Sequence, residues 1–171
     1  MKQDVVVVGY SETPITLRSG RSAYDLAGEA LSELLQSTGL AKDDIDGFCA
    51  TAALSEGDNP FHAVQLAELL GLQVEWLQLS SLGGCSMLAG LAAAVSAIRD
   101  GRCDVAVVIG ADAPSTVFNA RPAAHRAEFQ APLGFVQPPG AFGLLLSAYE
   151  ARHGSSALAL GKIATTSANT P

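Results

Sequence analysis

The sequence predicts an α/β protein in which helices pack on a mixed, mostly parallel sheet. Short apolar segments rich in β-branched residues alternate with longer segments that show helical spacing. Glycines and capping residues separate these segments where strands and helices are expected to end. Such an alternation is typical of parallel strands joined by helical crossovers. With 171 residues, of which 49% are hydrophobic, the chain is long enough to bury a substantial core.

The first predicted elements are a strand, a helix and a second strand. The strand covers Asp4–Gly9, a valine run of the kind that is buried on both faces. The helix begins at a capping box, in which Ser22 precedes Asp25 by three residues, and it ends at Gly39. The second strand is expected over Ile45–Thr51.

Two further strands enclose a long uncharged helix. A short helix opens at Asn59-Pro60 and ends at Gly71, and strands follow over Glu75–Leu79 and Asp104–Gly110. Between these strands, Leu82–Ile98 is an uncharged run of seventeen residues, close to the shortest length that spans a membrane. Its glycine-rich start and high alanine content favour a helix buried inside a layered α/β protein, so no membrane span is expected.

The last third of the chain is less regular. Residues 112–140 contain five prolines and scattered arginines, and a long irregular stretch of this kind is usually functional or part of an interface. Helices are expected over Ala141–His153 and Leu158–Ala168. The predicted organisation is an α/β core over 1–111, an irregular segment over 112–140 and a helical part over 141–171.

Composition narrows the class of protein. The formal net charge of −7 argues against binding to nucleic acid or to an anionic membrane, since both require a basic surface. The three cysteines lack the spacing of metal ligands, and no secretory signal pattern is present, so no metal and a cytoplasmic location are expected. Only 16% of the residues are charged, which favours an oligomer interface or a missing partner domain.

Five motifs in order carry a family resemblance: Val5–Pro14, Lys42–Phe48, Ile98–Asp112, Glu128–Gly134 and Ala141–Leu144. Together they resemble the N-terminal half of the thiolase superfamily, and most of all the lipid-transfer (sterol-carrier) type. The resemblance implies a layered αβαβα fold with a buried central helix. It also implies acyl-CoA thioesters as substrates and no bound cofactor. Full-length members contain two related halves, and the second half, which supplies the acid–base groups, is absent from this sequence.

The position of the family's nucleophilic cysteine falls on Gly84. Counting back seventeen residues from Gly101 reaches Gly84 rather than Cys85. The Gly-Gly-small-Ser pattern of Gly83 to Ser86 resembles a subgroup that lacks this cysteine. Members of the subgroup are aldolases that cleave β-hydroxyacyl-CoA thioesters, including steroid side-chain intermediates. They act with a partner protein that contains an OB-fold and often a zinc ribbon.

The chemistry of this turn leaves three interpretations open. Gly84 leaves backbone N–H groups uncovered at a helix start, which suits an oxyanion site for a thioester oxygen or enolate. Alternatively, Gly83 and Gly84 only form a tight turn and Cys85 is a small core residue. In the third interpretation Cys85 is the nucleophile, although a shift of one residue turns its direction by about 100°. The predicted site residues are Gly84 and Cys85, with Gly83 and Ser86 as substrate contacts.

Three functions follow from these interpretations. The leading hypothesis is an acyl-CoA lyase that cleaves a β-hydroxyacyl-CoA by a retro-aldol step, or a subunit of such an enzyme. The alternatives are an acyl-CoA thiolase or acyltransferase that uses Cys85, and a non-catalytic scaffold subunit. A homodimer or a hetero-oligomer is expected in each case.

Outside the turn, the histidines and arginines allow further hypotheses. Arg121, His125 and Arg126 form a basic island that is suited to the phosphates of coenzyme A or the carboxylates of a partner. The same island also fits a solvated loop without a function. His62 is interpreted as a surface or capping histidine, because the sequence places neither a base nor a nucleophile beside it.

Overall fold

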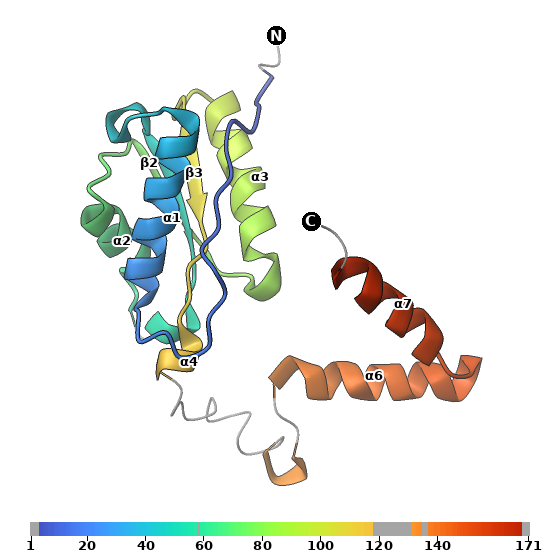
Figure 1. The fold of residues 1–171 in the computed structure, drawn as a ribbon. Helices are drawn as coiled ribbons and strands as arrows, with labels where there is room; N and C mark the ends of the chain where they lie inside the picture. The colour runs from blue at the N-terminus through green and yellow to red at the C-terminus, as the bar shows by residue number, and fades with distance from the viewer. Residues whose placement is uncertain (1–3, 58, 118–130, 135–136, 169–171) are drawn as a thin grey trace. The chain divides into compact units, whose positions relative to one another are not determined.

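The computed structural model describes residues 4–57, 59–117, 131–134 and 137–168 of the chain (Figure 1). The chain divides into two compact units, Met1–Asn119 and Ala120–Pro171, and each unit is described by itself. The first unit is an α/β layer structure, and the second contains helices. The predicted α/β fold class with a parallel sheet is therefore confirmed.

The sheet of the first unit has three described strands, all parallel. They are β1 (Gly47–Thr51), β2 (Trp76–Ser80) and β3 (Ala106–Ile109), in the order β2-β1-β3. The central strand β1 is buried along its whole length, with its first residue opposite the first residue of β2 and of β3. These strands confirm three of the four predicted ones: β1 and β3 are shorter than predicted, and β2 is shifted by one residue.

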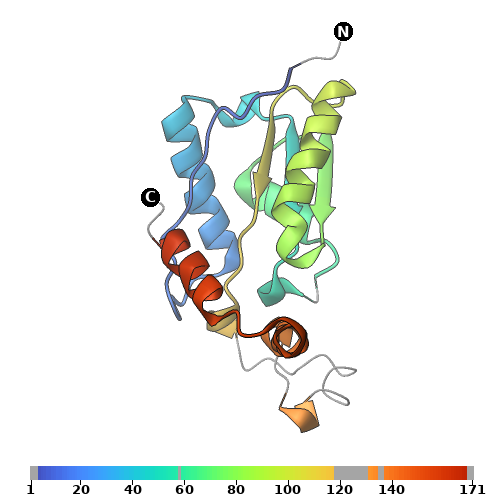
Figure 2. The ribbon, with the colours of Figure 1, turned by 90° about the vertical axis from the view of Figure 1, so that its right-hand side faces the viewer.

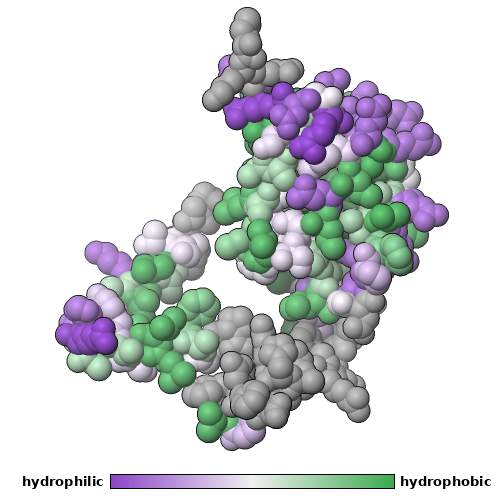
Figure 3. Space-filling model, turned by 180° about the vertical axis from the view of Figure 1, so that it is seen from behind, coloured by the Kyte–Doolittle hydropathy of each residue, from purple (hydrophilic) through white to green (hydrophobic). Residues whose placement is uncertain are grey.

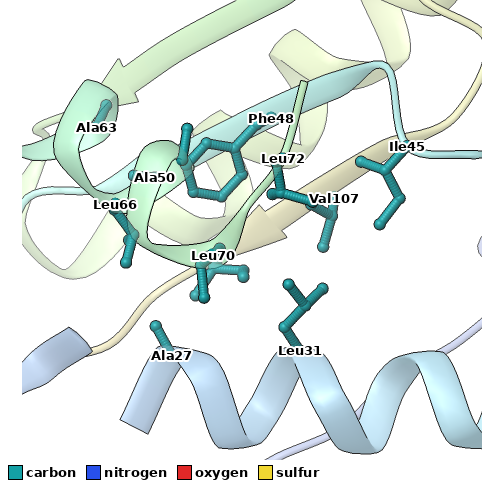
Figure 4. Close-up of a cluster of buried hydrophobic side chains, with 12 residues drawn as sticks. Ala27, Leu31, Ile45, Phe48, Ala50, Ala63, Leu66, Leu70, Leu72 and Val107 are labelled. Atoms are coloured by element: carbon teal, nitrogen blue, oxygen red, sulfur yellow. The ribbon is translucent and has the colours of Figure 1, made fainter. Parts of the chain in front are cut away.

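Helices cover both faces of this sheet (Figure 2). Helices α1 (Ala23–Thr38) and α2 (His62–Leu70) pack on one face, where their side chains surround Phe48 and Ala50 of β1 (Figure 4). Helix α3 (Ser86–Arg99) packs on the other face, against Cys49 of β1 and Trp76 of β2. This division follows from the alternation of side chains along a strand, which sends Cys49 and its neighbours to opposite faces.

The sequence signals for helix ends are confirmed in α1. The Ser22 hydroxyl accepts a hydrogen bond from the Asp25 N–H at 3.1 Å, and the Asp25 carboxylate accepts one from the Ser22 N–H at 2.9 Å. This reciprocal pair is the predicted capping box. Gly39 ends α1 with a φ of 74°, a left-handed conformation that a side chain disfavours.

The predicted strand over Asp4–Gly9 is wrong. The segment has no strand pairing among the described residues, and Val6, Val7 and Val8 are 73%, 75% and 67% exposed. It runs beside α1, where the Ser11 hydroxyl donates to the Ala30 carbonyl at 2.7 Å. A valine run favours an extended backbone but does not supply the partner strand that pairing requires.

Helix α3 is buried on its inner face only. At Gly90 the helix approaches the sheet so closely that an added Cβ would lie 3.0 Å from the Cys49 sulfur and from Val108. On the side away from the sheet Leu88 is 74% exposed and Leu91 is 41% exposed. The central helix implied by the resemblance therefore has an apolar outer face that the described residues leave uncovered.

Apolar side chains also gather on the face of the first unit that carries β2 (Figure 3). Leu77 and Leu79 of this edge strand are both 39% exposed. No charged residue occurs between Glu75 and Arg99, a stretch that contains β2 and nearly all of α3. A surface of this kind usually marks an interface.

The second unit contains the short helix η4 (Ala131–Leu133) and the helices α6 (Gln137–His153) and α7 (Ala157–Ala168). The two long helices confirm the helices predicted from the sequence. Between them, the Glu150 carboxylate accepts hydrogen bonds from the N–H and hydroxyl of Ser156, both at 2.8 Å. No described helix combines the length and apolarity that a membrane crossing requires.

Candidate functional site

Three loops follow the strands at the carboxyl-terminal edge of the parallel sheet, the edge at which ligands usually bind in α/β proteins. They are the loop after β1, the turn after β2, and the segment that leads from β3 into α4 (Pro114–Val117) (Figures 1 and 2). The Asp112 carboxylate accepts hydrogen bonds from the N–H groups of Leu54 at 2.8 Å and Ser55 at 3.0 Å. The third loop therefore fixes the first.

Ser86 stabilises the turn after β2 by accepting two hydrogen bonds. This residue is 5% exposed, and its hydroxyl accepts a hydrogen bond from the Leu82 N–H at 2.8 Å. Its carbonyl accepts another from the Ser80 hydroxyl at 2.9 Å. The structure thus gives Ser86 a part in fixing the turn, while a contact with substrate stays a prediction.

The turn itself is a single 3₁₀ turn, η3 (Gly83–Cys85), that leads directly into α3. Gly83 has a φ of 58°, which lies in the left-handed region and explains why glycine stands there. At Gly84 the feature is open space instead, since an added Cβ would meet no atom within 4 Å. The backbone at Gly84 is therefore accessible.

Hydrogen bonding around the turn leaves donors free. The Cys85 N–H donates to the Leu82 carbonyl at 3.3 Å, and the Ser86 N–H donates to the Gly83 carbonyl. Among the described residues, no hydrogen bond occupies the N–H of Gly83 or Gly84, as expected at the start of a helix. Free N–H groups at this place, together with the partial positive charge of a helix start, are suited to an oxyanion.

The three cysteines lie in different environments. Cys85 is exposed, whereas Cys49 and Cys103 are buried, and all three are free thiols. Burial raises the pKa of the Cys49 and Cys103 thiols, which keeps them protonated and unreactive. The interpretation of Cys85 as a core residue is not supported, and any thiol chemistry of the chain belongs to Cys85.

The ends of β1 and β3 pack closely against the first turn of α3, and together they are called the floor of the site. An added Cβ on Gly110, at the end of β3, would lie 2.6 Å from the Met87 sulfur and 3.1 Å from the Thr51 hydroxyl oxygen. Met87 is in the first turn of α3, so its side chain lies across the ends of β1 and β3. The start of α3 is thereby anchored to the sheet.

The structure brings together Gly83, Gly84, Cys85 and Ser86, as four consecutive residues must be. The predicted basic contacts Arg121, His125 and Arg126 lie outside the described residues. Among the residues that the structure describes, no group of three or more histidine, cysteine or acidic side chains is arranged to hold a metal ion.

Sequence reasoning missed a polar cluster behind the loop after β1. His62 is only 3% exposed, so its interpretation as a surface or capping residue is wrong. Its ring lies 5.6 Å from that of Tyr24, which belongs to α1. No local pattern indicates this pairing, because Tyr24 and His62 are separated by 38 positions.

Comparison with known proteins identifies the family. The N-terminal domain of thiolase matches residues 5–137, whereas no curated protein matches the chain. The solved structures that the chain resembles include "Ltp2-ChsH2(DUF35) aldolase", with a TM-score of 0.70, 21% identity and coverage of 86% of this chain. They also include an acetyl-CoA acetyltransferase from Syntrophomonas wolfei, with a TM-score of 0.53, 26% identity and coverage of 60% of this chain. A third is "AbyA1 - tetronic acid condensing enzyme", with a TM-score of 0.52, 24% identity and coverage of 61% of this chain.

The chain spans 38%, 27% and 32% of these three solved chains, respectively. The likeness to the aldolase and the condensing enzyme, both below 25% identity, shows the shared fold. The match to the thiolase domain covers more than half of the sequence. The protein therefore belongs to the thiolase family, and its sequence corresponds to the N-terminal domain of that family.

Proposed function

We propose that the protein is part of a thiolase-like acyl-CoA lyase that cleaves a β-hydroxyacyl-CoA thioester, with a steroid side chain as one candidate acyl group. The observation that carries the proposal is the open backbone at Gly84. The likeness to an aldolase over 86% of the chain is consistent with it. In this role the chain provides the oxyanion site and the floor of the substrate site.

The proposed step is a retro-aldol cleavage without a covalent acyl-enzyme. A base removes the proton of the β-hydroxyl, the Cα–Cβ bond breaks, and the β-carbon becomes a carbonyl. The electron pair of the broken bond forms the enolate of the shorter acyl-CoA, which then takes up a proton at Cα. The free N–H groups of Gly83 and Gly84 would stabilise the enolate oxygen, and such donors typically contribute about 3–4 kcal/mol.

We propose that the base and the coenzyme A contacts lie outside the Gly83–Cys85 turn. The resemblance assigns the acid–base groups to a second half, and Arg121, His125 and Arg126 are the proposed contacts to phosphate within this chain. A partner is also proposed, because the similar aldolase is named as a complex with a DUF35 protein. The uncharged edge strand β2 is the proposed site of a homodimer or hetero-oligomer contact.

Replacement of Gly84 tests the proposal. A Gly84→Val substitution places two methyl groups beside the free N–H groups, in space that is open in the structure. The fold should survive, while cleavage of a β-hydroxyacyl-CoA by the purified assembly should fall by about a hundredfold or more. Unchanged turnover would contradict an oxyanion role for this turn.

A second function is a thiolase or acyltransferase that uses Cys85, and the exposure of this thiol favours it. In that case incubation with an acyl-CoA should leave an acyl group on the peptide that contains Cys85. Mass spectrometry of the digested protein detects the added mass. Persistent absence of an adduct, with acyl-CoA bound, would exclude this function.

A further inference from the structure

Four polar side chains converge on the hydroxyl of Tyr24. The phenol oxygen lies 3.2 Å from the Glu56 carboxylate, 3.2 Å from the Gln65 side-chain oxygen, 3.2 Å from the Asn59 side-chain nitrogen and 3.5 Å from His62 Nδ1. Glu56 belongs to η2 (Leu54–Glu56), the short helix in the loop after β1. One phenol on α1 thus joins this loop to the start of α2.

The available hydrogens allow a single complete arrangement. A phenol donates one hydrogen and accepts two. The Asn59 side-chain amide has two hydrogens, of which one faces Gln65 Oε1 at 2.6 Å and the other faces the Tyr24 oxygen. Gln65 Oε1 thereby has a donor, and the Tyr24 hydrogen is free to bond the Glu56 carboxylate. This bond is the strongest that the phenol can donate here, because the acceptor is charged.

This arrangement fixes the hydrogen of the buried imidazole. If Nδ1 of His62 were an acceptor, it would compete with Glu56 for the single hydrogen of Tyr24. If Nδ1 carries a hydrogen, it donates to the second acceptor position of the phenol, and each of the five contacting atoms has a partner. Burial and the charge of Glu56 raise the pKa of the Tyr24 hydroxyl, which the Asn59 donor partly offsets, so that the phenol keeps its proton.

We propose that Tyr24 and His62 are positioning residues that fix the loop after β1 through hydrogen bonds running from His62 Nδ1–H to Tyr24 and from Tyr24 to Glu56. The same loop is held on its other side by Asp112. Held from both sides, Leu54 to Glu56 lie at the same edge of the sheet as the Gly83–Cys85 turn. That this part of the loop borders an acyl-CoA rests on the proposed function, whereas the order of the hydrogen bonds does not.

The tautomer of His62 tests the proposal without any measurement of activity. Ring ¹⁵N spectra of the full chain, recorded where the imidazole is neutral, should show hydrogen on Nδ1 of His62. In Tyr24→Phe, and independently in Glu56→Ala, the hydrogen should move to Nε2. An Nε2–H tautomer in the unaltered protein, or an Nδ1–H tautomer that persists in both variants, would overturn the proposal.

Hydrogen exchange provides the second measurement. The backbone amides of Leu54 and Ser55 should exchange about tenfold faster in Tyr24→Phe, since the part-buried hydrogen bond from Tyr24 to Glu56 is lost. Tyr149→Phe is the matched control, because Tyr149 lies on α6 in the second unit, where its ring lies 4.6 Å from that of His153. Equal protection in Tyr24→Phe and in the control would show that the phenol does not position the loop.

Discussion

At the scale of single residues, the adjacent glycines of the turn do different things. Gly83 is required by its backbone, since its φ of 58° is disfavoured for any residue with a Cβ. Gly84 has open space around it, so its lack of a side chain keeps the backbone accessible. Only the accessible backbone at Gly84 bears directly on the binding of an oxyanion.

Alanine substitutions should separate the two glycines. Gly83→Ala is expected to lower the free energy of unfolding by about 1 kcal/mol, because the left-handed conformation becomes strained. Gly84→Ala should change it by less than about 0.5 kcal/mol, the usual range for an open surface position. Denaturant unfolding measures both values. Equal losses would mean that Gly84 is also held for a structural reason.

Prediction from the sequence was most complete for local features of this kind. The capping box of Ser22 and Asp25 depends on residues three positions apart, so its pattern is visible in the sequence. The cluster around Tyr24 depends on residues from α1, η2 and α2 that only the tertiary fold brings together. For that reason the burial of His62 could not be predicted.

At the scale of elements, α3 combines a tightly packed inner face with an open outer face. Its small inner residues bring the helix close to β1, and an added Cβ on Gly90 would lie 3.0 Å from the Cys49 sulfur. Its outer leucines are exposed. The helix therefore packs one surface on this sheet, while the described residues leave its outer surface open.

Matched valine substitutions on the two faces of α3 test this description. The side chain of Gly90→Val would clash with the Cys49 sulfur and with Val108, so the helix would have to move away from the sheet. We therefore expect a loss of about 2 kcal/mol in unfolding free energy. Ala92→Val, on the exposed face, should cost only about 0.5 kcal/mol through lower helix propensity. Thermal or denaturant unfolding compares the two. Similar costs at both positions would contradict the close approach.

The capping box makes the stability of α1 depend on pH. The Ser22 N–H and hydroxyl lower the pKa of Asp25, so its charged form is bound more tightly in the folded state than in the unfolded chain. The stabilisation is complete above the unfolded pKa, which is about 3.9, and is lost as the pH falls through the lower folded pKa. Unfolding of Asp25→Asn, compared with the unaltered protein from pH 7 to pH 3, should therefore show a difference that shrinks on acidification. A difference that is constant over this range would contradict the capping role.

The N-terminal valines show why one element was predicted incorrectly. Four consecutive valines favour an extended backbone, and the segment is extended without helical structure. Strand formation also requires hydrogen bonds to a neighbouring strand, and such pairing is not encoded locally. The conformational preference was therefore correct in kind, while the pairing and the burial were wrong.

At the scale of the whole molecule, large apolar side chains are exposed on an edge strand of the sheet. The edge strand β2 exposes Leu77 and Leu79, and neither a charge nor a proline blocks its edge. Proteins that keep such an edge free usually protect it by one of these means. An assembly contact along β2 would explain why protection is absent.

A lysine on this edge should weaken assembly. Leu79→Lys places a charge on the exposed side of β2, so we expect a smaller species or the loss of a bound partner in light scattering after size-exclusion chromatography. Leu69→Lys, at a 61% exposed position of α2, is the matched control and should leave the mass unchanged. The same mass for all three proteins would place the interface elsewhere.

We propose that this thiolase-family chain supports carbon–carbon cleavage without a covalent bond to its exposed cysteine. The most direct measurement is the rate of β-hydroxyacyl-CoA cleavage by Cys85→Ala, in the assembly as purified, relative to the unaltered protein. We predict that the rate stays within about threefold, because the enolate is stabilised by backbone N–H groups and not by the sulfur. Complete loss of turnover, with the fold and the affinity for coenzyme A retained, would contradict this account and assign the chemistry to Cys85.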